Sequence, residues 1–353
     1  MAEKIKIGRT TVGEGCPPLF LPDIDVFFDQ DMQRAEAMVT KLVGDGVHTI
    51  KAAVVHDEEF ALDDDTQEKW YSENSVIVSE RYRELIARKV NSLNFYDRLF
   101  ARILELGCDL VLSVYDVAGA SFAKQAGAHA LKIPSSNITH EVCIRYAAGL
   151  GLPLLIDTGK STLEEIARAV QWARDEGLKD LIIEHSPEAP PSNLSNHHLR
   201  MIPSLASLFN CPVGLSDHHA GDEMLYAATA LGASVLEMGV CPDDAPPDQD
   251  VYHALRISDV APAMRKCNNI WQALGEPMRY LRRDRSPPTA RPGLVAKTML
   301  PAGTLLDENS VDFAFPAHGV GAEHWSLVAG WRLRRDLNPR DIIHWHDIEA
   351  VAP

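Results

Sequence analysis

The stretch PLLIDTGKSTLEEIARAVQWARDEGLKDLIIEHS, residues 153–186, contains the pattern that decides the fold. Its two ends, PLLIDTG and LIIEHS, are short apolar runs of the length and composition typical of buried strands. Between them apolar residues recur at helical spacing, and Ser161 and Glu164 have the spacing of a capping box. The stretch therefore predicts a strand, a helix and a second strand.

The same alternation of apolar run and helical segment extends along most of the chain. The runs lie at 4–8, 49–55, 110–115, 130–135, 153–159, 181–186, 212–217 and 233–240. Strands that are apolar on both faces and are followed by helices are typical of parallel sheets, and eight of them close into a (β/α)8 TIM barrel. An open doubly wound sheet is the alternative, which is disfavoured because no glycine-rich phosphate turn follows the first run.

Two segments fit a simple barrel less well. Residues 10–30 contain proline and glycine and are too long for an ordinary loop between the first strand and a helix predicted at 31–43. We expect a lid or an irregular cap there. Residues 56–70 predict a long surface loop whose acidic residues form a solvated face.

The C-terminal part has a different composition. Residues 276–292 mix charged residues with prolines, which is typical of a linker. From residue 293 onward, alternating apolar positions and turn residues predict a small β-rich domain. We therefore predict a barrel domain over 1–275, a linker over 276–292 and a small domain over 293–353.

Composition limits the possible partners and location. A formal net charge of −16 disfavours binding to nucleic acid or to anionic membranes. The first residues, MAEKIKIG, lack the apolar core of a signal peptide, so we expect a cytoplasmic protein without membrane contact. The six cysteines contain no CxxC pair and are interpreted as reduced packing residues.

Polar residues gather where the predicted strands end. The carboxyl ends of barrel strands meet at one rim, where catalytic residues are usually found, so we expect these side chains to point into one mouth. They are Lys51, Ser113, Asp116, Lys132, Ser135, Ser136, Asp157, Thr158, Lys160, Glu184, His185, Ser216, Asp217, His218, His219 and Glu237.

Lys51 and Lys132 interrupt apolar strands, where an unpaired ammonium group is costly. Together with the hydroxyl groups of Ser135, Ser136, Thr158 and Ser216, they predict a site for a phosphate or a carboxylate. The alternative is that each lysine pairs with an internal aspartate or glutamate. The histidines of these strand ends have a similar alternative, because a hydrogen-bonded core histidine is common.

Five further segments form a recognisable set: LKIPSSNITH (131–140), DTGKSTLEEI (157–166), IIEHSPEAPPSNLSNHHLR (182–200), VGLSDHH (213–219) and LGASVLE (231–237). Together they resemble the sialic acid synthase family, including its spore coat polysaccharide synthase-like branch. Residues 294–316 resemble an antifreeze-like SAF domain, a β-clip-like fold. The resemblance implies condensation of phosphoenolpyruvate with an N-acylamino sugar aldehyde to form an ulosonic acid. It also implies a divalent metal, manganese or magnesium, and a domain-swapped homodimer.

The resemblance assigns roles to individual residues. The family's phosphoenolpyruvate-binding positions match Lys51, Lys132, Ser135 and Ser216, and its metal-binding SDH histidine matches His218. The predicted substrate-binding residues are Lys51, Lys132, Ser135, Ser136, Thr158, His185 and Ser216. The predicted catalytic residues are Asp217, Glu237 and Asp250.

The chain departs from the family pattern at several positions. Gly239 stands where the second metal-binding histidine is expected, and Lys6 stands where the first strand carries a glutamate. In the small domain, Phe315 replaces an arginine that binds the sugar. A second metal ligand would have to come from Glu237, His219, Asp250, Cys241 or His185.

Two functions follow from this pattern. The leading hypothesis is an enzyme that makes a nonulosonic acid for surface polysaccharides from phosphoenolpyruvate and a sugar aldehyde. The other, favoured by Gly239, Lys6 and Phe315, is a catalytically altered or inactive homologue that acts as a binding or regulatory subunit. A Schiff-base lyase is disfavoured, because the sixth predicted strand carries Glu184 and His185 instead of a lysine.

Overall fold

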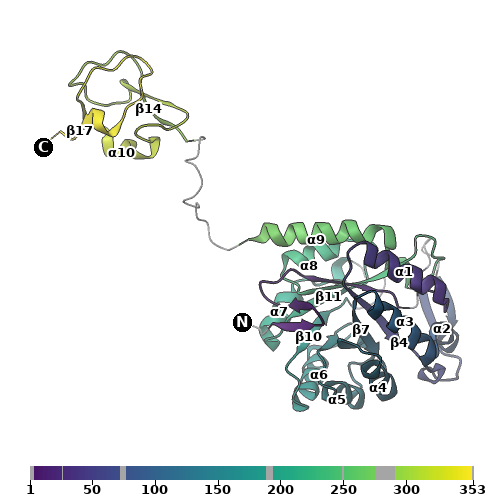
Figure 1. Ribbon diagram of the computed structural model, residues 1–353. Helices are drawn as coiled ribbons and strands as arrows, with labels where there is room; N and C mark the ends of the chain where they lie inside the picture. The colour runs from purple at the N-terminus through teal and green to yellow at the C-terminus, as the bar shows by residue number, and fades with distance from the viewer. Residues whose placement is uncertain are drawn as a thin grey trace. The chain divides into compact units, whose positions relative to one another are not determined.

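The computed structural model describes residues 4–25, 27–71, 77–187, 194–248, 250–275 and 291–351 (Figure 1). The chain divides into two compact units, residues 1–275 and 276–353. Residues 276–290 of the predicted linker lie outside the described residues. No helix within the described ranges has the length and apolar character needed to cross a membrane.

The first unit is a closed parallel barrel, as the alternation of strands and helices predicts. Its sheet runs in the order β11-β10-β9-β8-β7-β4-β3-β12, and pairing of β11 with β12 closes it. The strands are β3 (Leu19–Asp23), β4 (Thr49–Val54), β7 (Asp109–Val114), β8 (Ala130–Ile133), β9 (Leu154–Asp157), β10 (Leu181–His185), β11 (Val213–Asp217) and β12 (Val235–Cys241). The short β13 (Leu255–Arg256) extends β12 beyond the barrel.

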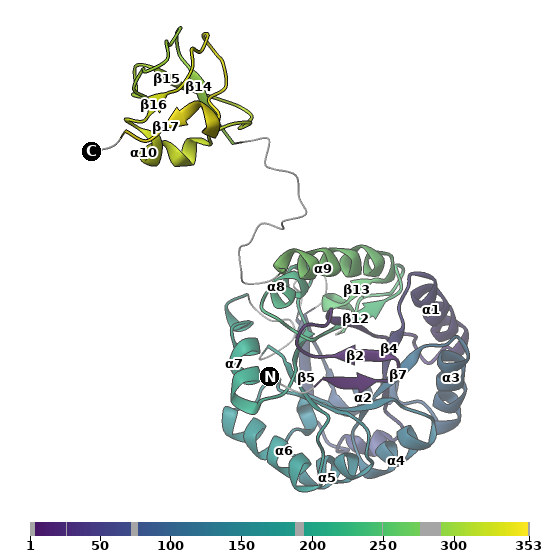
Figure 2. The same ribbon diagram turned by 60° about the vertical axis from the view of Figure 1, so that its left-hand side comes forward.

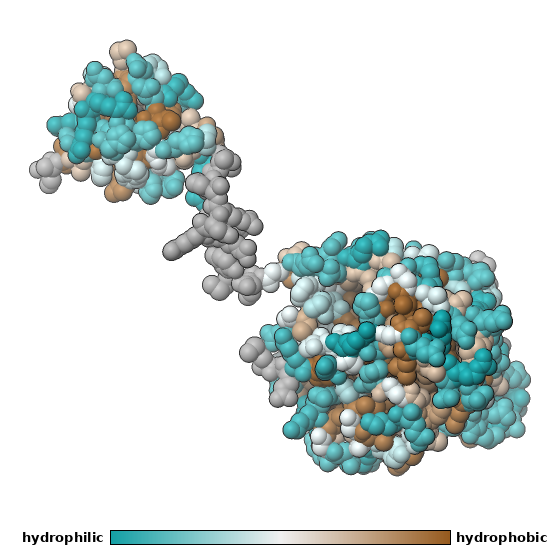
Figure 3. Space-filling view, viewed as in Figure 1, coloured by the Kyte–Doolittle hydropathy of each residue, from teal (hydrophilic) through white to brown (hydrophobic). Residues whose placement is uncertain are grey.

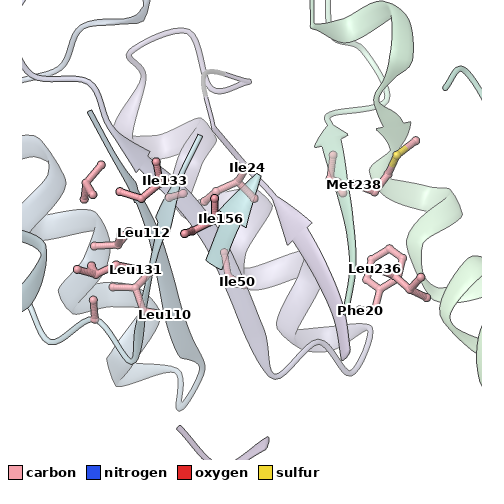
Figure 4. Packing of buried hydrophobic residues seen from close by; sticks show 14 of the residues in the cluster. Phe20, Ile24, Ile50, Leu110, Leu112, Leu131, Ile133, Ile156, Leu236 and Met238 are labelled. Carbon is pink, nitrogen blue, oxygen red and sulfur yellow. The ribbon is translucent and has the colours of Figure 1, made fainter. Parts of the chain in front are cut away.

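Helices surround the strands and cover their outward-facing residues (Figure 2). They are α1 (Met32–Gly44), α3 (Leu93–Glu105), α4 (Val117–Gln125), α5 (Glu141–Gly149), α6 (Leu163–Asp175), α7 (Met201–Phe209), α8 (Glu223–Ala230) and α9 (Val260–Leu274). Figure 4 shows Leu112, Ile133 and Ile156, from neighbouring strands, in this core. The capping box of α6 is formed by Thr162 and Glu165, one residue later than the spacing of Ser161 and Glu164 predicts.

The prediction that 4–8 is the first barrel strand is wrong. Residues Ile5–Ile7 form β1, which pairs antiparallel with β2 (Thr10–Val12). Side chains of this hairpin pack against inward-facing residues near the amino ends of the barrel strands, such as Leu155 and Ile182. The hairpin lies across the barrel in Figure 2 and closes the end opposite the strands' carboxyl ends, so it is no lid over the mouth.

The first barrel strand is β3, which lies inside the segment predicted as a lid. Its sequence, LFLPD, is a short run containing Pro22, which weakens the strand signal in the sequence. Asp23 ends this strand. The expectation that Lys6 replaces an acid of the first strand is therefore wrong as well, because Lys6 belongs to the hairpin.

The segment 56–70, predicted as a surface loop, has regular structure. It contains the 3-10 turn Glu58–Phe60 and β5 (Gln67–Tyr71), which pairs with β6 (Ile77–Arg81). The helix α2 (Tyr82–Lys89) follows directly. This excursion between β4 and α3 contributes side chains to the cavity described below.

The second unit is small and β-rich, as predicted. Its elements are β14 (Gly293–Ala296), β15 (Val311–Ala314), α10 (Trp325–Val328), β16 (Arg332–Leu333) and β17 (Ile348–Glu349). It has a core of its own that includes Leu294, Leu306, Val320 and Ile343. In the view of Figure 3, hydrophilic residues are interspersed with hydrophobic ones over the surface of each unit.

Gly214, on β11, packs closely against the neighbouring strand β12. A Cβ atom at Gly214 would lie 2.8 Å from both the Cβ atom and the carbonyl oxygen of Val235 on the neighbouring strand. We expect Gly214→Ala to lower the free energy of unfolding by about 1–3 kcal/mol, because backbone there cannot move aside freely. Gly44→Ala is the control, since nothing lies within 4 Å of a Cβ at that position. Urea unfolding of both variants measures the effect, and equal stabilities would contradict it.

Candidate active site

A cavity of about 910 Å³ lies at the carboxyl ends of the barrel strands. Its lining comes from several strands and from the loops that follow them, together with α2. Nine of the predicted site residues line it: Lys51, Lys132, Ser135, Ser136, Ser216, Asp217, His218, Glu237 and Asp250. The barrel topology thus brings together residues that are up to about 200 positions apart in the chain.

Lys132, on β8, is only 2% exposed and lies among three carboxylates. Its Nζ atom is 3.0 Å from Asp157 and 2.9 Å from Glu184, and it donates a hydrogen bond to Glu237. These three carboxylates have the spacing of a possible metal site. The ammonium group lies among the three and compensates part of their negative charge, so we describe these carboxyl groups as the ionic partners of Lys132.

Lys51, on β4, has a similar environment. Its Nζ atom donates a hydrogen bond of 2.5 Å to Asp23 and lies 3.8 Å from Glu237. The Oγ atom of Ser216 donates to the same Glu237 oxygen over 3.2 Å. Both lysines therefore pair with internal carboxylates, as the alternative predicts, yet they share one carboxylate and line one cavity.

The shared carboxylate is held in its ionised form. Burial raises the pKa of Glu237, but the ammonium groups of Lys132 and Lys51 outweigh this and bring it to about 2. Glu184 shows the opposite balance. Burial, followed by repulsion from Glu237, raises its pKa well above the usual range. Neighbouring carboxyl groups thus differ in their affinity for a proton, as acid–base sites require.

Asp25 follows β3 and lines the same cavity. Burial raises its pKa to about 7, the charge of Asp23 adds to this, and Lys51, then Lys89, oppose it. Between about pH 4 and pH 7 the folded protein therefore keeps a proton that the unfolded chain releases. Because the folded state binds more protons, this group lowers the stability as the pH rises through that window.

We expect Asp25→Asn to remove this contribution. The free energy of unfolding of the wild type should fall more steeply between pH 4.5 and 7.5 than that of the variant, by up to about 1.4 kcal/mol per pH unit. Urea unfolding at several pH values measures both slopes. Parallel pH profiles would show that Asp25 titrates normally in the folded protein.

Two imidazoles meet on another side of the cavity. The rings of His218 and His253 have centroids 4.9 Å apart and planes at 78° to each other. Burial is the main cause that lowers the pKa of both, to about 3 for His253. Asp250 lies next to His253, with Oδ1 3.8 Å from Nε2, and its other oxygen accepts a 2.5 Å hydrogen bond from Lys89.

Position 239, where a second metal-binding histidine was expected, is closely packed. A Cβ atom at Gly239 would lie 3.1 Å from the Cζ atom of Phe27 and 3.5 Å from Cβ of Ala254. The space that the missing side chain leaves is therefore filled by the Phe27 ring and by the segment that follows Asp250. A histidine at this position would displace its neighbours.

Thr158 and His185, both predicted to bind the substrate, do not line this cavity. They line a second one of about 1170 Å³, which also borders α7. Thr158 donates its hydroxyl to the carbonyl oxygen of Glu184, and the Nε2 atom of His185 lies 2.6 Å from the carbonyl oxygen of His197. His185 thus has the environment of a hydrogen-bonded core histidine, and we leave both residues out of the proposed site.

The lining also includes titratable residues that were not among the predicted site residues, of which Asp23, Asp25, Lys89 and His253 matter most here. Asp23 ends a strand whose sequence signal is weak, and Lys89 ends α2, a helix that the sequence analysis does not predict. His253 follows Asp250 at a spacing of three, which is the one sequence signal that links it to a predicted site residue.

Comparison with known proteins agrees with the family resemblance seen in the sequence. Residues 38–279 match the model of the NeuB family, and residues 291–349 match the SAF domain. The N,N'-diacetyllegionaminic acid synthase of Legionella pneumophila is 23% identical over 345 residues, 96% of each chain. A pseudaminic acid synthase of Campylobacter jejuni is 24% identical over 304 residues, 86% of this chain and 88% of the relative.

Solved structures with the same fold include the spore coat polysaccharide biosynthesis protein SpsE of Bacillus subtilis. It is 20% identical and has a TM-score of 0.66 over 99% of this chain and all of its own. The NeuB match spans more than half of the chain, and the SAF match follows it. The resemblance to sialic acid synthases is confirmed: this chain belongs to the NeuB family and carries a C-terminal SAF domain.

Proposed function

We propose that this protein condenses phosphoenolpyruvate with the aldehyde of an N-acylamino sugar to form a nonulosonic acid for surface polysaccharides. The observation that carries the proposal is the meeting of Lys51, Lys132 and Ser216 around Glu237 at the carboxyl ends of the barrel strands. Family membership supports it, since relatives named as legionaminic and pseudaminic acid synthases align over most of the chain.

In the proposed reaction the enol carbon of the donor attacks the aldehyde carbon, water adds at the carbon that carries the phosphate, and phosphate leaves. The ammonium groups of Lys51 and Lys132 would face the negative charges of the donor, and Ser216 would donate a hydrogen bond. Ser135 and Ser136, at the end of β8, line the same cavity and would contact the donor as well.

Proton transfers fall to the buried carboxyl groups. Burial raises the pKa of Asp217 to about 7, close to the pH at which a general acid or base is most effective. Glu237 stays ionised and would stabilise positive charge. Asp250, whose pKa burial raises but Lys89 brings down to about 2, also stays ionised. Asp217, Glu237 and Asp250 are therefore our proposed catalytic residues.

The charge balance of the cavity supports a bound cation. Lining residues include four lysines, Lys51, Lys89, Lys132 and Lys160, against nine aspartates and glutamates. An anionic donor needs additional positive charge to enter such a cavity. The buried Nδ1 atom of His218 has no hydrogen-bond partner, which fits a metal ligand. When bound, a manganese or magnesium ion would polarise the aldehyde oxygen of the acceptor.

The partner and location predictions go with the proposed reaction. Phosphoenolpyruvate and a sugar aldehyde remain the proposed substrates, and a domain-swapped homodimer in the cytoplasm remains a prediction. Phe315, which replaces the family's arginine, is 66% exposed on the small unit. Analytical ultracentrifugation tests the dimer directly.

A second candidate function has specific observations in its favour. Phe27 packs against Gly239, and three carboxylates enclose Lys132, so that its ammonium group is already fully paired. Both features suit a catalytically altered homologue that keeps the fold and acts as a binding or regulatory subunit.

The two candidates are separated by measuring phosphate release from phosphoenolpyruvate with manganese, across a panel of N-acylhexosamines and neutral aldoses. Condensation predicts release that depends on one class of acceptor, together with a new ulosonic acid detected by mass spectrometry. Folded, manganese-supplied protein that releases no phosphate with any acceptor would reject the enzyme and leave the binding subunit.

A further inference from the structure

We propose that His253 is the second protein ligand of the divalent metal at this site, acting together with His218. The proposal deepens the proposed function and rests on it for the presence of a metal. It differs from the sequence-based expectation, because His253 is not among the residues from which a second ligand was expected.

The first support is the pairing of the two imidazoles. His218 follows β11, His253 lies in the 3-10 turn Val251–His253 after β12, and both line the cavity at the carboxyl ends of the barrel strands. Their ring centroids are 4.9 Å apart. Two imidazoles from adjacent barrel segments that face one cavity can bind the same ion, and the remaining positions stay open for substrate oxygens.

The second support is that their nitrogen atoms lack partners. His253 is 3% exposed, and neither of its ring nitrogens has a hydrogen-bond partner. The buried Nδ1 atom of His218 lacks one too. Leaving a buried polar atom unsatisfied costs about 1–3 kcal/mol, so several of them together indicate that something binds there.

The third support is the surroundings of His253. The Oδ1 atom of Asp250 lies 3.8 Å from the Nε2 atom of His253. The Nζ atom of Lys89 donates a 2.5 Å hydrogen bond to the other carboxylate oxygen of Asp250 and so holds it in place. Metal-binding histidines almost always have a carboxylate, a backbone carbonyl or a water at the nitrogen that does not bind the metal, and this partner orients the ring. The side chains of Asp250 and Lys89 would therefore position His253.

The fourth support links His253 to the missing histidine at 239. Ala254 lies 3.5 Å from the position of a Cβ atom on Gly239. The side chain of a larger residue at 239 would need space between Phe27 and Ala254, which leaves less room for the segment that contains His253. Glycine at this position is therefore compatible with bringing His253 next to His218, so that one imidazole is lost and another takes its place.

The other candidate ligands are engaged elsewhere or lie away from this pair. The Asp157, Glu184 and Glu237 carboxylates surround Lys132. The Nε2 atom of His219 lies 3.6 Å from the Oε2 atom of Glu223. The thiol of Cys241 donates a hydrogen bond to the carbonyl oxygen of Leu255. His185 contacts the carbonyl oxygen of His197.

The test is metal binding by the full-length protein without substrates. Isothermal titration with Mn²⁺ should show one site per chain in the wild type, weakened at least about 100-fold in both His218→Asn and His253→Asn. His219→Asn is the matched control, since His219 neighbours His218 but does not line the cavity, and it should bind like the wild type. Wild-type affinity in His253→Asn overturns the proposal.

A second variant guards against loss of folding. In His253→Cys a thiolate would replace the imidazole, so Co²⁺ should give a thiolate charge-transfer band that the wild type lacks. Bound Co²⁺ without that band rejects residue 253 as a ligand. The test also separates this proposal from the proposed function. Metal binding that depends on His253, in a protein that turns over no phosphoenolpyruvate, rejects only the proposed reaction.

Discussion

Lys132→Met is expected to lower the free energy of unfolding by about 3–5 kcal/mol at neutral pH, among the largest effects of any single change in this protein. The ammonium group of Lys132 lies within 3.0 Å of carboxyl oxygens of Asp157, Glu184 and Glu237, all of them buried. Methionine has a similar length and no charge, so the loss would come from carboxylates left without a counterion. Urea unfolding followed by circular dichroism measures it.

The stability loss of Lys132→Met should itself depend on pH. At lower pH the uncompensated carboxylates take up protons, so the difference between wild type and variant should shrink between pH 7.5 and pH 5. Lys124→Met is the control, because Lys124 lies exposed near the end of α4 and its loss should change stability by less than about 0.5 kcal/mol. A loss at Lys132 that matches this control would contradict the description of the charge cluster.

Lys51→Met is expected to reduce kcat/KM for phosphate release by about 1000-fold or more. Lys51 lines the cavity and shares Glu237 with Lys132, so it is placed to bind the donor's charge. Its other role is to neutralise Asp23, whose Oδ2 atom accepts a 2.5 Å hydrogen bond from the Nζ atom of Lys51. Loss of activity in this single variant could come from either role.

The double variant Lys51→Met/Asp23→Asn separates the two roles. Removal of both charges leaves no unpaired carboxylate at Asp23, so stability should recover most of what Lys51→Met loses. If Lys51 binds the donor, phosphate release stays low in the stable double variant. Recovery of activity together with stability would show that Lys51 serves only as the counterion of Asp23.

The sequence predicts the architecture because the barrel repeats one simple pattern. Apolar runs such as 181–186 and 212–217, separated by helical segments, predict a closed parallel sheet, and closure brings their polar carboxyl ends together. For this reason the sequence predicts that Lys51, Lys132 and Ser216 lie at one rim. It does not identify the first barrel strand, because β1 has the alternation of a strand, whereas β3 is short and contains Pro22.

The contacts within the site depend on features that periodicity does not encode. Whether Lys132 meets Glu184 depends on strand register and on which face each residue occupies. His253 lies in a turn after β12, and the next residue, Ala254, lies 3.5 Å from where a Cβ atom on Gly239 would be. The sequence therefore indicated Gly239 as a missing ligand but not the imidazole that lies nearby.

In the proposed function, the amines of Lys51 and Lys132 form a site for phosphoenolpyruvate at the barrel mouth. Isothermal titration of the full-length protein with phosphoenolpyruvate, in the presence of Mn²⁺, tests it most directly. We predict saturable binding of one molecule per chain that is lost in the stable Lys51→Met/Asp23→Asn variant. Absence of binding to the wild type, with and without Mn²⁺, would contradict the account.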